Sequence, residues 1–191
     1  MLWSKAIGAA GAGVDVVSYS GNSGAVSSGD LIVPATTSNQ MLVLATRTNS
    51  DTPAATLSGF TSAVVTSNSF RSLRVQYRTG SYSSQTFNTG TNNAYIIFDG
   101  ATSVGQTATV GSNASDFVIP YSGLSGVSTN GSSAIGVFTY APFRITDVSG
   151  GFTTLSGVCG YLESAPNTIL GGSITHSVDV YHVTATVEFK S

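Results

Sequence analysis

Ser173-Ile-Thr-His-Ser-Val-Asp-Val-Tyr-His-Val-Thr-Ala-Thr-Val-Glu-Phe-Lys190 is the stretch of the chain that decides the fold. β-Branched and aromatic residues dominate it, and no Gly or Pro follows Gly172. Residues of this kind fit the half-buried surface of a sheet, so the whole stretch is predicted to be one long β-strand.

The apolar residues of this strand change phase halfway along it. They occupy even positions at first and odd positions later: Ile174, Val178 and Val180, then Tyr181, Val183, Ala185, Val187 and Phe189. Side chains alternate faces along a strand, so a straight strand would expose half of this set. We therefore predict a β-bulge or sharp bend near Tyr181–His182, where the strand turns a corner of a sandwich or barrel.

The remainder of the chain supplies shorter strands. Apolar runs between Gly-, Ser- and Asn-rich turns predict strands at 14–19, 30–34, 40–47, 62–66, 70–79, 94–99, 116–120, 134–140, 143–148 and 155–162. The unbroken apolar run from Met41 to Ala45 is typical of a strand covered on both faces. No segment has a sustained helical period. About ten to twelve strands indicate an all-β sandwich or barrel of residues 14–191, preceded by a short arm, residues 1–13.

Charge is scarce in this protein. Only 8% of its 191 residues are charged, against about 25% in an average soluble protein, and the net charge is −2. This balance offers no field for nucleic acid or an acidic membrane. Low charge with a surface of Ser, Thr, Asn and Gly is common in extracellular and particle-bound proteins, where neighbouring copies pack closely.

The single cysteine, Cys159, excludes an intrachain disulfide and is interpreted as a small buried hydrophobe. No run reaches the roughly 18 apolar residues of a membrane-spanning helix. The first residues lack the basic start and apolar region of a secretory signal, so synthesis in a cytoplasm is expected.

The arm consists of small residues around three larger apolar ones, Leu2, Trp3 and Ile7. A Gly/Ala segment is loose unless something holds it. These three side chains are predicted to bind either a neighbouring chain or the arm's own domain, and the sequence leaves both possibilities open.

The segment from Phe70 to Arg78 places Arg74 and Arg78 on one face of a strand. Two arginines on one face could hold a sugar acid or a partner's carboxylate. Alternatively, the row is a solvated strand face or protects a sheet edge.

Signals for catalysis or metal binding are weak. His176 and His182 lie six residues apart, roughly 20 Å along a strand, and Asp179 points to the other side, so these residues do not form a metal site. Only two glutamates are present, and neither a nucleophile elbow nor a phosphate loop occurs. We expect no enzyme activity, metal or cofactor. Three loop tyrosines, Tyr82, Tyr121 and Tyr161, could instead form a sugar-stacking platform or simply be half-buried.

Several short patterns in this order resemble a group of small all-β virion proteins of tailed bacteriophages. They are Ser28-Gly-Asp-Leu-Ile-Val33, Met41-Leu-Val-Leu-Ala-Thr-Arg47, Leu57-Ser-Gly-Phe-Thr61, Arg71-Ser-Leu-Arg-Val-Gln-Tyr-Arg78 and Thr184-Ala-Thr-Val-Glu-Phe189. Phe60 stands where the group usually has Trp, and the one Trp of this chain lies in the arm.

The resemblance implies a jelly-roll-like sandwich without enzyme activity and a place in the virion, as a tail, fibre, baseplate or head-decoration component. It also implies self-association, with a homotrimer as the first expectation. A glycan-binding module for the host surface is the alternative, and a glycan-cleaving enzyme is disfavoured by the scarcity of acids.

Overall fold

The structure is a computed structural model that describes residues 13–21, 31–87, 93–128, 132–141, 144–155, 158–162 and 167–191. These residues contain fifteen β-strands and no α-helix. The first seven strands are β1 (Asp15–Gly21), β2 (Leu31–Val33), β3 (Gln40–Thr48), β4 (Thr61–Ser67), β5 (Ser72–Thr79), β6 (Gln85–Phe87) and β7 (Asn93–Asp99). The others are β8 (Ser103–Tyr121), β9 (Leu124–Ser125), β10 (Ser133–Thr139), β11 (Ile145–Val148), β12 (Thr153–Leu155), β13 (Cys159–Leu162), β14 (Thr168–Ile169) and β15 (Gly172–Lys190).

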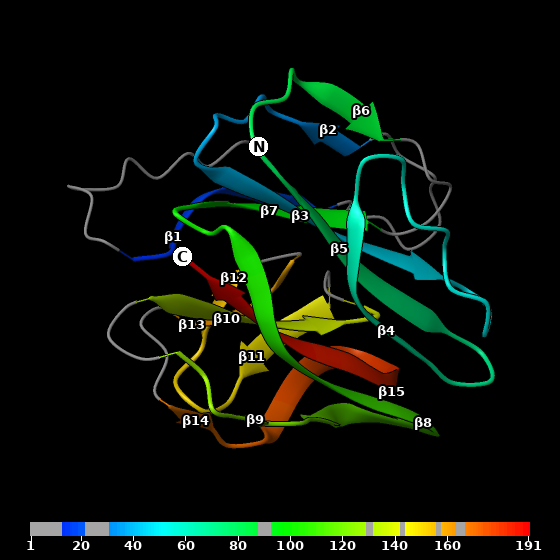
Figure 1. Ribbon diagram of the computed structural model, residues 1–191. Helices are drawn as coiled ribbons and strands as arrows, with labels where there is room; N and C mark the ends of the chain where they lie inside the picture. The colour runs from blue at the N-terminus through cyan, green and yellow to red at the C-terminus, as the bar shows by residue number, and fades with distance from the viewer. Residues whose placement is uncertain are drawn as a thin grey trace.

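Two large antiparallel sheets pack face to face (Figure 1). The first sheet has the order β1-β7-β3-β5-β4. The second has the order β11-β15-β10-β13-β12, with β8 paired along the other edge of β15. The all-β sandwich predicted from the sequence is confirmed. These strand orders do not establish a jelly-roll connection, which stays a prediction.

The main core lies between the two sheets. It joins buried side chains of β3 and β7 in the first sheet to those of β10 and β15 in the second. Phe98 and Phe189 meet across it with ring centroids 4.6 Å apart, and Phe138 packs edge-on against Phe189. Such aromatic pairs add about 1 kcal/mol to the free energy of burial.

Strand β3 is covered on both faces, as its continuous apolar run predicts. Met41, Val43 and Ala45 face the main core. Leu42 and Leu44 face a smaller core on the outside of the first sheet. The β2–β6 ribbon and the turn before β4 cover this smaller core, which also contains Leu31, Val33, Phe60, Tyr95 and Ile97.

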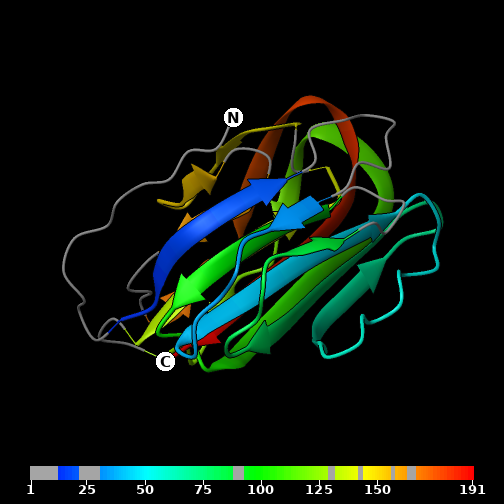
Figure 2. The ribbon, with the colours of Figure 1, turned by 90° about the horizontal axis from the view of Figure 1, so that it is seen from above.

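Strand β15 folds back on itself. In the ladder with β8, Ser173 is the partner of Pro120. The hydroxyl of Thr184 nevertheless donates a hydrogen bond of 3.0 Å to the carbonyl of Pro120. Eleven residues of straight strand would separate Ser173 from Thr184 by roughly 36 Å. The ribbon of β8 and β15 must therefore arch, and Figure 2 shows the two strands arching together.

The arch explains the change of phase in the sequence. Between the pairs Thr175↔Val118 and Val180↔Asp116, four residues of β15 stand opposite one residue of β8, and a second shift follows Tyr181. Ile174 and Val180, on either side of the first shift, enter a third core on the far side of the second sheet. After the second shift, Val183, Ala185, Val187 and Phe189 enter the main core. The predicted bend is confirmed, although it begins before Tyr181, and Val178 is exposed at the arch.

The strand predictions were wrong in three respects. The first thirteen residues of β8, 103–115, were not predicted as strand, because Gly, Ser, Thr and Asn dominate them. The short strands β6, β9 and β14 were also missed, and the predicted strand 155–162 divides into part of β12 and all of β13. These elements are held by pairing with distant strands, which local propensity does not report.

Candidate functional site

Arg74 of β5 binds its own protein. Its Nε donates a hydrogen bond of 2.7 Å to the carbonyl of Ala54, and its Nη1 donates to the hydroxyls of Thr56 and Ser62 at 3.0 and 2.7 Å. Arg74 therefore holds the segment before β4 against the first sheet.

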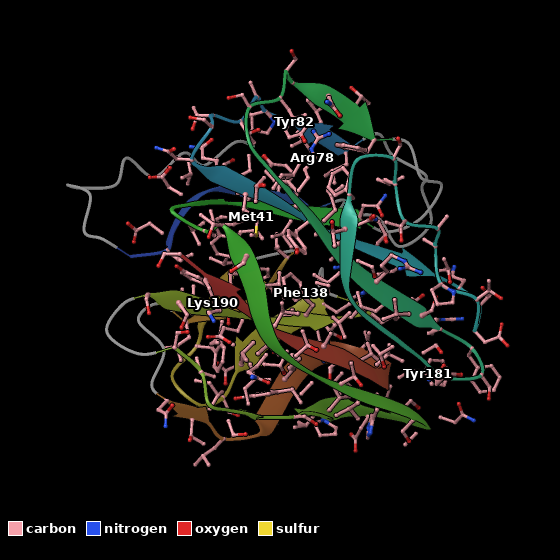
Figure 3. All side chains as sticks on the ribbon, viewed as in Figure 1. Met41, Arg78, Tyr82, Phe138, Tyr181 and Lys190 are labelled. Carbon is pink, nitrogen blue, oxygen red and sulfur yellow. The ribbon has the colours of Figure 1, made fainter. Side chains whose placement is uncertain are left out.

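Arg78, four residues further along the strand, is buried among aromatic rings. Its guanidinium carbon lies 3.7 Å from the ring centroid of Tyr82, and Figure 3 labels both residues. The ring centroid of Phe60 lies 4.7 Å from the same carbon. A third ring, Phe87, lies 5.8 Å away. Burial lowers the pKa of Arg78, and the nearby Tyr82 opposes this shift.

This geometry corrects both interpretations of the arginine row. Gln76, between the two arginines, is completely buried, so this face of β5 is not solvated. Arg78 is only 8% exposed and cannot hold a partner's carboxylate without local rearrangement. The turn Leu57-Ser-Gly-Phe60 closes the site: Gly59 adopts a left-handed φ of 78°, and Phe60 N–H donates to the carbonyl of Leu57.

Of the two interpretations of the loop tyrosines, the sugar-stacking platform is contradicted and packing within the protein is supported. Tyr121 and Tyr161 are buried in different cores. The Tyr121 hydroxyl donates to the carbonyl of Ser149 at 3.0 Å, and that of Tyr161 to the carbonyl of Val14 at 3.2 Å. Burial raises the pKa of Tyr121, against the effect of its hydrogen bond to Ser149. Tyr82 is half-buried over Arg78, so the three tyrosines share no surface. The predicted arm residues, Leu2, Trp3 and Ile7, lie outside the described residues.

A buried polar group lies where β3 ends between the two sheets. Arg47 is 1% exposed, and its Nε donates 2.8 Å to the carbonyl of Thr139. Burial lowers the pKa of Arg47 to about 9, opposed by Cys159 and Tyr140. Burial also raises the pKa of the Cys159 thiol, opposed by Arg47. Cys159 is a neutral, fully buried side chain, as predicted, and not an activated nucleophile.

Arginine and aromatic side chains gather outside this buried group, in a cluster that we call the aromatic–arginine end. It consists of Phe70 and Arg71 in the β4–β5 turn, Tyr140 after β10 and Tyr181 at the arch of β15. The rings of Phe70 and Tyr181 stack with centroids 5.2 Å apart and an angle of 26°. The Arg71 guanidinium carbon lies 5.1 Å from the Tyr140 centroid and 5.4 Å from that of Tyr181.

Hydrogen bonds from neighbouring segments fix the backbone and side chains of the cluster. The Asn68 side chain accepts from the N–H groups of Phe70 and Arg71, each at 2.8 Å, and donates 2.7 Å to the carbonyl of Ser112 in β8. The Tyr140 hydroxyl donates to the side chain of Asn49. Burial raises the pKa of Tyr140, and Arg71 and Arg47 oppose this shift.

Sequence reasoning missed this cluster. Its members come from three segments as much as 111 positions apart, and no spacing in the sequence relates them. Only the pair Phe70-Arg71, apolar and charged residues within an Asn/Ser turn, gave a local signal. Figure 3 places Tyr181 at one end of the molecule, far from the Arg78–Tyr82 pair.

Within the described ranges, no three His, Cys, Asp or Glu side chains lie close enough to hold a metal ion. His176 is buried, whereas Asp179 is exposed at the arch. Across the same ranges, no helix has the length and apolar character needed to cross a membrane.

Comparisons of this chain with models of protein families, with curated proteins and with solved structures find no match.

Proposed function

We propose that this protein is a non-enzymatic structural component of a tailed-bacteriophage virion, made in the host cytoplasm and assembled into the tail, fibre, baseplate or head decoration. The proposal depends on the order of the five sequence patterns that resemble such proteins. All five contain residues of the cores described above, from β2 and β3 through the turn at Phe60 and strand β5 to the end of β15. A jelly-roll relationship and a homotrimer belong to the same proposal.

The architecture suits a particle component. Apolar cores lie on both faces of each large sheet, and close-packed interiors of this kind have low compressibility. The described titratable groups include Arg47, Cys159 and His176, all buried with pKa values shifted against ionisation. Such groups support a fold, whereas a hydrolytic site needs accessible acids and bases at matched pKa values.

Self-association would use the arm and a β surface. Leu2, Trp3 and Ile7 are the apolar residues that the arm offers to a neighbouring subunit or to the particle. The arm leads into β1, an edge strand of the first sheet that pairs only with β7 among the described strands. An edge strand has unpaired backbone groups that an incoming strand can bind.

The test is a Trp3→Ala substitution in the full chain. We expect a smaller mass in native mass spectrometry and weaker incorporation into virions, with thermal melting of the variant to confirm that the fold is retained. Leu170→Ala is the matched control, because Leu170 is 79% exposed and belongs to none of the three cores. Full assembly of the Trp3→Ala protein would contradict the anchoring role of the arm. If the wild-type protein is monomeric and absent from virions, the proposed function is contradicted.

A second candidate function is recognition of a surface glycan. The observation that favours it is the aromatic–arginine end, not the three tyrosines predicted from the sequence. Binding of the purified protein to whole host cells, lost after treatment of the cells with periodate, would support this function.

A further inference from the structure

The aromatic–arginine end has an exposed aromatic face. One face of Phe70 stacks on Tyr181, yet the side chain remains 45% exposed. Phe70 stands on a turn fixed by Asn68. Rigid aromatic rings of this kind offer an apolar surface on which the C–H face of a sugar ring can stack.

The same cluster carries the positive charge of Arg71. Arg71 Nη1 donates a hydrogen bond of 2.8 Å to the carbonyl of Phe70, and Arg71 Nε is buried without a hydrogen-bond partner among the described residues. The Arg71 guanidinium also lies over the rings of Tyr140 and Tyr181. Arginine presents a planar array of donors that matches a carboxylate, so an anionic group is the complementary ligand.

The exposed ring of Phe70 and the guanidinium of Arg71 both lie next to the ring of Tyr181. Phe70 and Arg71 both lie within 5.4 Å of the Tyr181 centroid, within reach of neighbouring units of one oligosaccharide. The turn is held by the Asn68 bonds and by a bond of 2.9 Å from Ser69 N–H to the Asn113 side chain. A site formed in advance loses less conformational entropy when a ligand binds.

We propose that the aromatic–arginine end is a binding subsite for an acidic polysaccharide, in which a sugar ring stacks on Phe70 and a uronic-acid carboxylate pairs with Arg71. The inference rests on the second candidate function and names its ligand class. It does not depend on the virion role.

The experiment measures binding of a galacturonic acid trimer to the full-length protein by calorimetry at low salt, with a neutral galactose trimer as the paired probe. We expect the acidic trimer to bind at least tenfold more tightly than the neutral one and to weaken as salt is added. Phe70→Ala and Arg71→Gln should each weaken binding of the acidic trimer at least tenfold, and Arg71→Lys should weaken it less than Arg71→Gln does.

The matched control is Phe117→Ala, which removes another exposed phenylalanine, on β8, that is not one of the four residues of the cluster. It should leave binding unchanged, and thermal melting of every variant confirms that the fold is retained. The proposal is overturned if the acidic trimer does not bind, if Phe117→Ala weakens binding as much as Phe70→Ala does, or if citrate competes fully and Phe70→Ala has no effect, which would indicate a simple anion site.

Virion incorporation of the Arg71→Gln protein separates this inference from the structural role. Normal incorporation with lost trimer binding supports the subsite. Loss of incorporation together with unchanged trimer binding identifies the cluster as an assembly surface and overturns the subsite.

Discussion

The carboxylate of Glu188 accepts a hydrogen bond of 2.8 Å from the backbone N–H of Gln106, inside a bulge of β8. Its second oxygen accepts 2.7 Å from the N–H of Ser128. Gly105 makes room for this arrangement, because a Cβ at that position would lie 2.0 Å from the Glu188 carboxylate. A single acid, 1% exposed, thus joins β15 to β8 and to the segment after β9.

Substitution Glu188→Gln should therefore destabilise the protein. The amide keeps one acceptor but turns an N–H group toward one of the two backbone N–H groups. Hydrogen bonds to charged groups contribute about 1.5–3 kcal/mol, so we expect a loss of about 2 kcal/mol in the free energy of unfolding, measured in urea.

Asp147→Asn is the control for this loss of charge, because Asp147 is an exposed acid on β11. It should change the free energy of unfolding by less than about 0.5 kcal/mol. Equal stability of Glu188→Gln and the wild type would show that the two backbone hydrogen bonds contribute nothing.

His176 should make the stability depend on pH. It is 3% exposed, neither ring nitrogen has a well-formed hydrogen bond, and burial lowers its pKa from 6.5 to about 4, against the opposing effect of the Ile174 backbone. The unfolded chain takes up a proton below pH 6.5 while the folded chain does not until about pH 4. Stability is therefore lost as the pH falls through this window, by about 2 kcal/mol between pH 7 and pH 5.

The measurement compares urea unfolding of the wild type and His176→Leu at both pH values. The carboxylates titrate in both proteins, so only the difference between their pH dependences reports on His176. The wild type should lose about 2 kcal/mol more than the variant, and parallel curves would show that His176 ionises normally in the folded protein.

Gly111→Ala should separate the two sheets at one edge. A Cβ on Gly111 would lie 2.4 Å from the carbonyl oxygen of Ser67, so β4 and β8 must move apart. The bonds from Thr66 to Val110 and from Asn68 to Ser112 would weaken. We expect a loss of about 1–3 kcal/mol, the usual cost of overpacking.

Thr109→Ala, on an exposed β8 side chain two positions away, is the control for Gly111→Ala and should lower the melting temperature far less. Because Asn68 also orients Phe70 and Arg71, the Gly111→Ala protein should bind the galacturonic acid trimer more weakly. A melting temperature equal to that of the wild type would show that β4 and β8 do not approach this closely in solution.

Some of this architecture was readable in the sequence because it depends on local patterns. Side chains alternate strictly along a strand, so the shift from Val180 to Val183 required a bend wherever the strand lay. The run Met41–Ala45 required cover on both faces for the same reason. Cys159 lay in an apolar run, and its burial followed.

Other features depended on partners that the sequence does not identify. Residues 103–115 resemble a loop in composition but become strand because β15 offers a ladder. The row of Arg74, Gln76 and Arg78 resembled a solvated face, since nothing in the chain indicated that the turn at Phe60 and the ring of Tyr82 would cover it.

The sequence by itself determined the all-β class, the double-sided strand β3 and the bent terminal strand, because hydrophobic alternation is a property of consecutive residues. Tertiary structure alone decided which polar side chains are buried and which aromatic rings meet. Phe70, Arg71, Tyr140 and Tyr181 converge only because the arch of β15 brings Tyr181 to the β4–β5 turn, and contacts between distant segments depend on packing that no local pattern encodes.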